Sequence, residues 1–186
     1  MSQYKDKQKE IKDTLIQLLK KKPIHKIPVK EICDSLYMAR STFYSYYSDI
    51  YDVMEQIEEE QIAALKSMNT RFFIQDFWKD VRSSYRYFIP TLEYIRDRKE
   101  TFQVLMNAAN NGTFIYKWKK IISEDFADKY HYERCIPENE GLVLEMISST
   151  IIGAYTYWIN NDELISVETI AKELFRKTCT DFITKI

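Results

Sequence analysis

Apolar side chains recur at intervals of three and four residues along almost the whole chain, which is the period of an α-helix. A first apolar stripe consists of Ile11, Leu15, Leu18 and Leu19. Pro23 and Pro28 then interrupt the pattern, because proline removes a backbone donor and cannot continue a helix. The 186 residues include only three glycines and four prolines, fewer turn signals than a sheet protein of this size needs. The pattern therefore predicts an all-α protein.

Two short helices are predicted after the first stripe, over about 29–36 and 41–47. Asp49 is placed to cap a fourth helix, whose apolar stripe begins at Ile50. Two short helices joined by about four residues match the helix-turn-helix plan. In that plan the second helix enters the major groove of DNA, led by its N-terminal residues.

The second half of the chain continues with helical periodicity. Helices are expected over 74–88, ended or bent by Pro90, over 102–109, closed by a turn at 110–112, and over 114–126. Pro137 is expected to open the most apolar helix, and a last helix covers 167–183. The segment 146–159 is interrupted by serine and threonine and falls short of the ~20 apolar residues of a membrane span, so no membrane association is expected.

The helix after Pro137 is apolar on more than one face, so it must be buried on two sides. Its own chain can cover one side, and a second copy of the chain can cover the other. We therefore expect a homodimer whose interface uses this helix and the last one. The residues assigned to this interface are Ile147, Ile151, Tyr155, Trp158, Leu174 and Thr178.

Charge is unevenly distributed, although the net charge is only −1. Residues 1–48 contain ten lysines and arginines against five acids, and the rest of the chain is acidic. A basic head on an acidic body suggests that the head meets a polyanion. A solvated helix face is the alternative explanation of the same charges.

Catalytic and metal-binding signals are weak. Cys33, Cys135 and Cys179 are widely spaced, without a CxxC pair, which is typical of a reduced, cytoplasmic protein. His131 and Cys135 lie four residues apart, but one such pair does not make a metal site. The sequence has no phosphate-binding glycine loop and no nucleophile or metalloprotease motif. We expect no cofactor, no metal and no catalytic residue.

Many aromatic residues lie in the second half, and most of them are explained by helix packing. Helical domains can also leave a pocket between helices that aromatic and methionine side chains line. The residues assigned to such a ligand pocket are Tyr85, Phe88, Phe102, Met106, Trp118 and Tyr155.

The helix at 41–47 has an inward and an outward face. Phe43 and Tyr47, four residues apart, are expected to anchor it to the core. Arginine can pair with guanine, and hydroxyl groups can bind bases or phosphates. The residues expected to contact DNA are Lys30, Arg40, Ser41, Thr42, Tyr44, Ser45 and Tyr46.

The run "VKEICDSLYMARSTFYSYYSDIYDVMEQI" resembles the DNA-binding domain of the TetR family of bacterial transcriptional regulators. The resemblance covers residues 5–60 and depends most on "STFYSYYSD". The segment "IIGAYTYWINNDELISVETIAKELF" resembles the paired dimerisation helices of some members. The resemblance implies a DNA-binding domain at 1–51 and a helical regulatory and dimerisation domain at 52–186. It also implies a homodimer on a palindromic operator, and an inducer bound in the body.

The chain departs from the family pattern at four positions. Tyr37 stands where the turn usually has glycine, and Ala39 stands where a serine usually caps the recognition helix. Ser41 is expected to cap that helix instead. Ser45 and Ile50 replace basic residues that relatives use on phosphates, so Lys5, Lys7, Lys9 and Lys30 are expected to compensate.

These features together predict a cytoplasmic, DNA-binding repressor that a ligand releases from its operator. Two alternatives stay open at this point. A helix-turn-helix relative could act through a protein partner, as a co-activator or adaptor with weak DNA binding. A helical enzyme would instead need a pocket with a perturbed acid or base.

Overall fold

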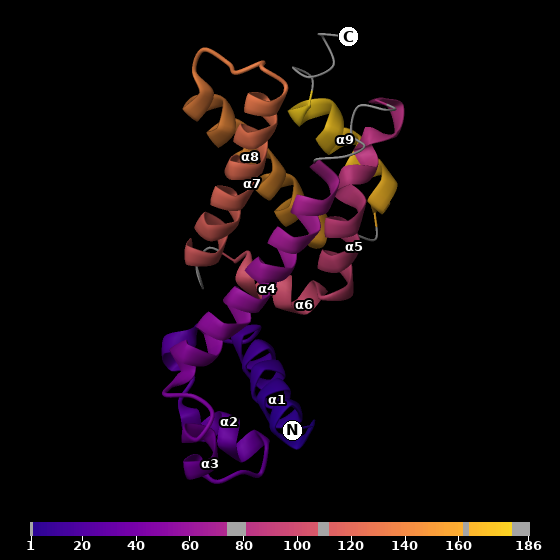
Figure 1. The fold of residues 1–186 in the computed structure, drawn as a ribbon. Helices are drawn as coiled ribbons and strands as arrows, with labels where there is room; N and C mark the ends of the chain where they lie inside the picture. Colours follow the sequence, from indigo (N-terminus) through magenta and orange to yellow (C-terminus); the bar gives the residue numbers. More distant parts are fainter. Residues whose placement is uncertain (1, 74–80, 108–111, 162–163, 180–186) are drawn as a thin grey trace.

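The computed structural model describes residues 2–73, 81–107, 112–161 and 164–179 (Figure 1). Every element assigned within these residues is a helix, so the predicted all-α fold is confirmed. The elements are α1 (Ser2–Leu19), η1 (Ile24–Lys26), α2 (Val29–Ser35), α3 (Arg40–Tyr44), α4 (Ile50–Phe73), η2 (Val81–Phe88), α5 (Ile89–Asp97), α6 (Lys99–Leu105), α7 (Gly112–Tyr132), α8 (Glu140–Ile159) and α9 (Val167–Thr178).

The helices α1, α2 and α3 lie together at one end of the molecule, here called the head (Figure 1). Apolar residues of α1, including Ile11 and Leu15, are fully buried there with Ile32 of α2. Phe43 and Tyr47 are also buried, and their ring centroids lie 6.0 Å apart. The prediction that these two rings anchor the third helix is confirmed.

The long helix α4 begins in the head and continues into the rest of the fold (Figure 1). Asp49 caps it as expected, because its Oδ1 accepts a hydrogen bond from the backbone N–H of Asp52 at 2.9 Å. The Asp52 carboxylate in turn accepts from the backbone N–H of Ser48 at 2.8 Å, and this bond lowers the pKa of Asp52. At 24 residues, α4 is about 36 Å long and crosses residue 51 without a break. The division into domains at that residue stays a prediction.

The helices from α5 to α9, together with η2, pack into a second unit, here called the body (Figure 1). Trp118 of α7 lies at its centre, with the rings of Phe102 and Phe114 each 5.7 Å away. Tyr155 of α8 stacks on Trp118 at 5.3 Å. The predicted stripe of α7 is buried, as helix packing requires.

Several expected boundaries in the second half were wrong. Residues 81–88 form a 3₁₀ helix, and Pro90 opens α5 instead of ending a helix. This fits the preference of proline for the first turn, where its missing N–H has no helical partner. The apolar helix begins at Glu140, three residues after Pro137. Parts of the expected helices and turn, at 74–80, 108–111 and 180–183, lie outside the described residues.

The helix α8 buries one side and exposes the other. Seven of its residues, Ile151 and Trp158 among them, are buried between α7, α9 and the rest of the body. Leu142, Met146 and Tyr157 are more than half exposed. By length and composition this helix could cross a membrane, but a buried side of this kind is equally typical of a core helix in a folded domain.

Candidate nucleic-acid interface

The outer surface of α2 and α3 carries the residues expected to contact DNA. Phe43 turns inward from α3, which is only five residues long, and fixes the helix to the head. Five of the seven expected residues are exposed on this surface, and the other two, Thr42 and Tyr46, are half-buried. The exposed residues are Lys30, Arg40, Ser41, Tyr44 and Ser45. The fold therefore brings these side chains to one end of the molecule without burying them.

Local contacts restrict two of these side chains. The Ser45 hydroxyl donates a hydrogen bond to the carbonyl oxygen of Thr42 at 2.7 Å. Because a serine hydroxyl has one proton, Ser45 can then only accept from a ligand in this conformation. The DNA contact of Ser45 stays a prediction, and in this conformation its hydroxyl would need a donor on the DNA. The ring of Tyr44 packs edge-on against Phe43 at 5.5 Å and leaves its other side exposed.

The turn before α3 closes α2 with a left-handed residue. Tyr37 has φ of 50°, and its N–H donates to the carbonyl of Asp34 at 3.4 Å. The N–H of Met38 donates to the carbonyl of Cys33 at 3.0 Å. These two bonds are those of a Schellman motif, in which glycine is usual at the left-handed position. Tyr37 therefore does occupy the glycine position of the turn, and the conformation costs a side-chain-bearing residue about 1–2 kcal/mol.

The start of α3 lacks the expected capping side chain. Ala39 is the N-cap residue, with φ −69° and ψ 147°, and no side chain of the described residues caps the helix. Ser41 lies inside the helix, so the prediction that it caps α3 was wrong. The burial of Phe43, more than local hydrogen bonding, therefore stabilises this short helix.

The positive charge of the head is largely matched by acids. Lys7 and Lys9, expected to compensate on phosphates, pair with Glu10 at 2.5 Å and with Asp13 at 2.6 Å on their own helix. Three further lysines form ion pairs: Lys12 with Glu60, Lys20 with Glu100 and Lys22 with Glu31. Exposed pairs of this kind are weak and screened by salt, so DNA phosphates could replace these acids at low energetic cost.

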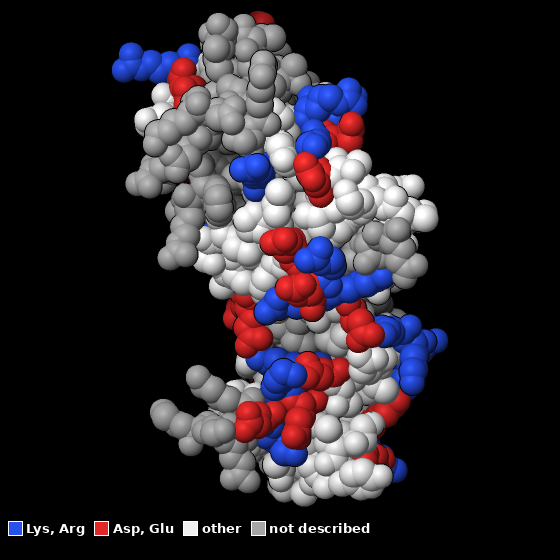
Figure 2. Space-filling model, turned by 90° about the vertical axis from the view of Figure 1, so that its right-hand side faces the viewer, with Lys and Arg blue, Asp and Glu red and all other residues white. Residues whose placement is uncertain are grey.

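Four of the nine lysines and arginines whose side chains are described in the head lie outside such pairs. Among the residues that the structure describes, those without an ion pair are Lys21, Lys26, Lys30 and Arg40. Figure 2 shows blue and red side chains interspersed over the face it views, without a large blue patch. The head can therefore attract DNA, but less strongly than its count of lysines suggests.

The first turn of α4 has no basic residue that could bind a phosphate. Ile50, at the position where relatives have lysine, is buried in the head. Its neighbour Tyr51 is 57% exposed, and Tyr37 in the turn is 99% exposed. Sequence reasoning missed both tyrosines as surface residues, although a large side chain at a glycine position was a usable signal for Tyr37.

The aromatic centre of the body encloses only a small hollow, of about 10 Å³. Phe88, Trp118 and Tyr155 line it, as expected for a ligand pocket. Phe102 and Met106 are buried outside its lining. Tyr85 lies elsewhere, because its hydroxyl donates to Glu168 of α9 at 3.2 Å. In this conformation the predicted pocket is filled by its own side chains.

Two tyrosines line this hollow, Tyr155 with a buried side chain and Tyr87 with a half-buried one. Burial raises the pKa of Tyr87 and that of Tyr155 well above the ordinary value, so both are neutral at physiological pH. The ring of Tyr155 lines the hollow. A neutral phenol can donate a hydrogen bond, so this group would favour a ligand that accepts one.

The residues expected at the dimer interface are already covered within one chain. All six, from Ile147 to Thr178, are buried against the body. The outward face of α8 carries a different stripe at helical spacing, consisting of Leu142, Met146, Ser149, Gly153 and Tyr157. Any second copy on α8 must therefore meet this outward stripe.

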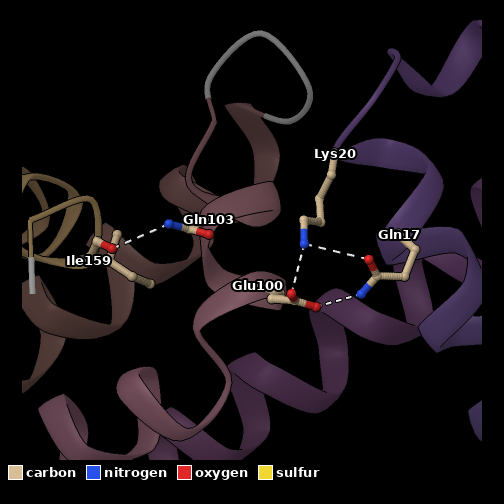
Figure 3. A network of polar contacts seen from close by, with 5 residues as sticks. All are labelled: Gln17, Lys20, Glu100, Gln103 and Ile159. Atoms are coloured by element: carbon tan, nitrogen blue, oxygen red, sulfur yellow. Dashed lines mark hydrogen bonds and ion pairs between the residues drawn. The ribbon is translucent and has the colours of Figure 1, made fainter.

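One helix, α6, contacts both the head and the end of α8 (Figure 3). Glu100 accepts hydrogen bonds from Gln17 of α1 at 2.5 Å and from Lys20, the residue after α1, at 2.7 Å. These bonds lower the pKa of the Glu100 carboxyl. One turn later, Gln103 donates to the carbonyl of Ile159 at 3.3 Å. A polar groove of about 1060 Å³ lies beside this contact, between α1 and the α5–α6 corner.

The described residues contain no group of three or more histidine, cysteine, aspartate or glutamate side chains that could hold a metal ion. His131 lies 3.3 Å from Glu140 and Cys135 is half-buried nearby in sequence. The His131–Glu140 pair is a contact between the end of α7 and the start of α8.

A helix-turn-helix head joined by one long helix to an aromatic helical body defines a class, the helical transcriptional regulators. Residues 82–178, slightly more than half of the chain, match the family described as the transcriptional regulator C-terminal region of the TetR type. The chain belongs to the TetR family of transcriptional regulators. The resemblance of residues 5–60 to the DNA-binding domain of that family agrees with this assignment.

Similar proteins support the same family. The uncharacterized HTH-type transcriptional regulator YxbF of Bacillus subtilis is 24% identical over 167 residues, which cover 89% of this chain and 43% of YxbF. The chain thus spans less than half the length of that relative.

Three solved structures share the fold. The fatty acid degradation regulator FadR from Bacillus halodurans has a TM-score of 0.66 at 15% identity, covering 91% of this chain and 93% of its own. A TetR regulator from Streptococcus agalactiae has a TM-score of 0.63 at 19% identity, covering 96% of this chain and 99% of its own. The dihydroxyacetone kinase operon activator DhaS has a TM-score of 0.58 at 15% identity, covering 93% of this chain and 94% of its own.

Proposed function

We propose that this regulator binds a palindromic operator as a homodimer, through the exposed surface of α2 and α3, and represses transcription there. The observation that carries the proposal is the position of Arg40 and Tyr44, exposed on a helix that Phe43 holds to the head. In a helix-turn-helix protein this helix enters the major groove. Arg40 would then pair with guanine, and the hydroxyls of Ser41 and Tyr44 would bind bases or phosphates.

Homodimerisation would come from the outward stripe of α8, from Leu142 to Tyr157, packed against the same stripe of a second copy. Such a two-fold arrangement is self-complementary. It would have to place the two copies of α3 about 34–36 Å apart, so that both read successive major grooves on one side of DNA.

An inducer would act by changing that separation. The hollow of about 10 Å³ holds no more than one water molecule. Its proposed ligand must therefore part the stacked rings of Trp118 and Tyr155, and α6 would carry the movement to α1 through Glu100. A ligand that prefers this opened state shifts the population away from DNA binding. We propose an apolar molecule with an acceptor for the Tyr155 hydroxyl.

A second candidate function is supported by the paired lysines of the head. If the head binds DNA weakly, the exposed tyrosines Tyr37, Tyr44 and Tyr51 could instead meet a protein, since aromatic residues are enriched at protein interfaces. One protein of the same fold, DhaS, is named an operon activator. In either role the protein would act in the cytoplasm, and because its family consists of transcriptional regulators, no enzymatic activity is proposed.

Selection of bound duplexes from a random-sequence pool, at about 50 mM salt, tests the operator directly. We expect one palindromic sequence to be enriched. Arg40→Ala should weaken binding to it by about 10–100-fold and weaken binding to unrelated DNA less. Arg134→Ala removes an equal charge from an exposed turn of the body and should change neither.

The outcomes separate the two candidate functions. No retained duplex, even at this low salt, would overturn the operator proposal and favour a protein partner. Equal losses on both DNAs would show that Arg40 contacts only the phosphate backbone.

A further inference from the structure

Two described non-glycine residues have positive φ, and both lie in the same kind of turn. Tyr37 has φ of 50° after α2, and Arg134 has φ of 54° after α7. After α7, the N–H of Cys135 donates to the carbonyl of Tyr130 at 3.0 Å, and that of Arg134 to His131 at 3.2 Å. This is the same Schellman pattern as in the head. Both residues therefore occupy a position where glycine would relieve strain.

Strain by itself does not assign a role to Tyr37, because Arg134 carries the same backbone. The two side chains differ in chemistry and place. Arg134 is a charged side chain exposed to water, which needs no further explanation. Tyr37 is a large aromatic ring, 99% exposed, and makes no side-chain contact with the described residues that would offset its strain.

The position of Tyr37 beside α3 suggests a role for its exposed ring. It lies three residues before Arg40, the first residue of α3, in the turn that leads into the proposed recognition helix. Met38, the next residue, is half-buried against the core, so the turn is fixed to the head. Ser45 and Ile50 stand at the two positions where the family pattern has basic residues. Ile50 is buried, and the hydroxyl proton of Ser45 is donated to the carbonyl of Thr42.

We propose that Tyr37 contacts the sugar–phosphate backbone of DNA, its hydroxyl donating to a phosphate oxygen and its ring lying against the adjoining deoxyribose. This inference rests on the proposed function, DNA binding through α2 and α3. Tyrosine hydroxyls are among the groups that bind phosphates and fix register. Since the phenol is neutral, the contact strengthens binding to all sequences without adding to the salt dependence, which reflects charge neutralisation.

Three variants of the full chain test this role. Tyr37→Phe keeps the ring and the backbone and removes only the hydroxyl. Tyr37→Gly removes the side chain and the strain together. Arg134→Gly is the matched control, because it removes the same strain from the same motif in the body.

The measurements are the melting temperature of each variant and its affinity for the enriched operator and for an unrelated duplex between 50 and 200 mM salt. Tyr37→Phe should leave the melting temperature unchanged and weaken binding to both duplexes about tenfold, as expected for a hydrogen bond to a charged group. The slope of log affinity against log salt should stay the same. Tyr37→Gly should bind at least as weakly and melt about 1–4 °C higher. Arg134→Gly should also melt higher and bind like the wild type.

Wild-type affinity in Tyr37→Phe or Tyr37→Gly would overturn the role of Tyr37 while leaving the operator proposal intact. A reduced salt slope in Tyr37→Phe would also overturn it, because a neutral hydroxyl cannot account for a change in charge neutralisation. If the wild type itself binds no duplex, both the role of Tyr37 and the operator proposal fail.

Discussion

Tyr155 has two opposing effects on the stability of the body. Its ring stacks on Trp118 at 5.3 Å and fills the centre of the body. Its phenol is buried beside a hollow of about 10 Å³, and burial disfavours the ionised form. The ring thus stabilises the body, whereas an ionised hydroxyl would destabilise it.

The ionisation of this phenol gives a test at high pH. Burial raises the pKa of Tyr155, so the folded state holds the proton more tightly than the unfolded chain does. Stability is therefore complete below the ordinary tyrosine pKa of about 10, and it falls as pH rises above that value. Tyr155→Phe removes one titrating proton, so its free energy of unfolding should fall less steeply with pH, by about 1.4 kcal/mol per pH unit.

Urea unfolding between pH 8 and pH 11 measures this effect. Part of the fall should persist in Tyr155→Phe, because burial raises the pKa of Tyr87 as well. Tyr116→Phe, at an exposed position of α7, is the control and should follow the wild type. Parallel curves for Tyr155→Phe and the wild type would contradict the burial of this hydroxyl.

Some residue-level features could be predicted from sequence and others could not. The spacing of Phe43 and Tyr47 was sufficient to place both rings in the core. The cap of α3 was wrongly assigned to Ser41, because local sequence favours a hydroxyl cap while the fold sets the start of the helix through Phe43. The ion pair of Lys20 with Glu100 joins residues 80 positions apart and leaves no periodic signal in the sequence.

The two faces of α8 explain why the residues expected at the dimer interface lie on its inward side. Both faces carry apolar or small residues, so periodicity predicts burial on two sides but cannot tell which face turns inward. The inward face contains Ile151 and Trp158. The outward face contains Met146 and Tyr157. The existence of the helix was predicted correctly, whereas its orientation needed the packing of α7 and α9.

The helix α6, like α4, contacts both the head and the body. Glu100 binds α1, and Gln103 binds the last carbonyl of α8 (Figure 3). A shift at the end of α8 would therefore move α6 and, through it, the last turn of α1. The lowered pKa of Glu100 means that this contact is complete above the ordinary carboxyl pKa of about 4.3 and is lost as pH falls through the lower folded value.

Replacing the Glu100 carboxylate tests this connection at neutral pH. Glu100→Gln removes the charge that Lys20 binds and should loosen the last turn of α1. We expect faster amide hydrogen exchange around Gln17 to Lys20 and about 2–10-fold weaker operator binding, with the α3 surface unchanged.

Glu173→Gln is the matched control, because it breaks an exposed ion pair with Arg176 within α9 that joins no two elements. It should leave the exchange of α1 and the operator affinity unchanged. Equal exchange of α1 in Glu100→Gln and the wild type would show that apolar packing alone holds head and body together.

At the scale of the whole molecule, α4 links events in the body to the position of the head. It is a single helix of 24 residues that contacts α1 in the head and α5 and α7 in the body. On its body side, Gln61 accepts a hydrogen bond from Tyr94 at 2.8 Å, and Glu58 pairs with Lys117 at 3.2 Å. A tilt of α4 would therefore move the whole α2–α3 surface, as the proposed release from DNA requires.

Two such heads act together only if the body dimerises, and the outward stripe of α8 is the proposed interface. Leu142, Met146 and Tyr157 are 62%, 61% and 60% exposed, and the small residues Ser149 and Gly153 lie between them. An apolar stripe of this kind, with small residues at its centre, allows two helices to approach closely. The residues of the opposite face are already buried within one chain.

A charge in this stripe should therefore separate the subunits without unfolding them. Met146→Glu places like charges close to each other across the two-fold axis, so sedimentation should show monomers at concentrations where the wild type is dimeric. Operator affinity should fall by about 10²–10⁴-fold, because each head then binds its half-site alone.

Tyr116→Glu adds the same charge on the exposed side of α7 and should stay dimeric. Ile151→Glu should unfold the body instead, since Ile151 is buried within one chain. A dimeric Met146→Glu protein with wild-type operator affinity would place the interface on another surface.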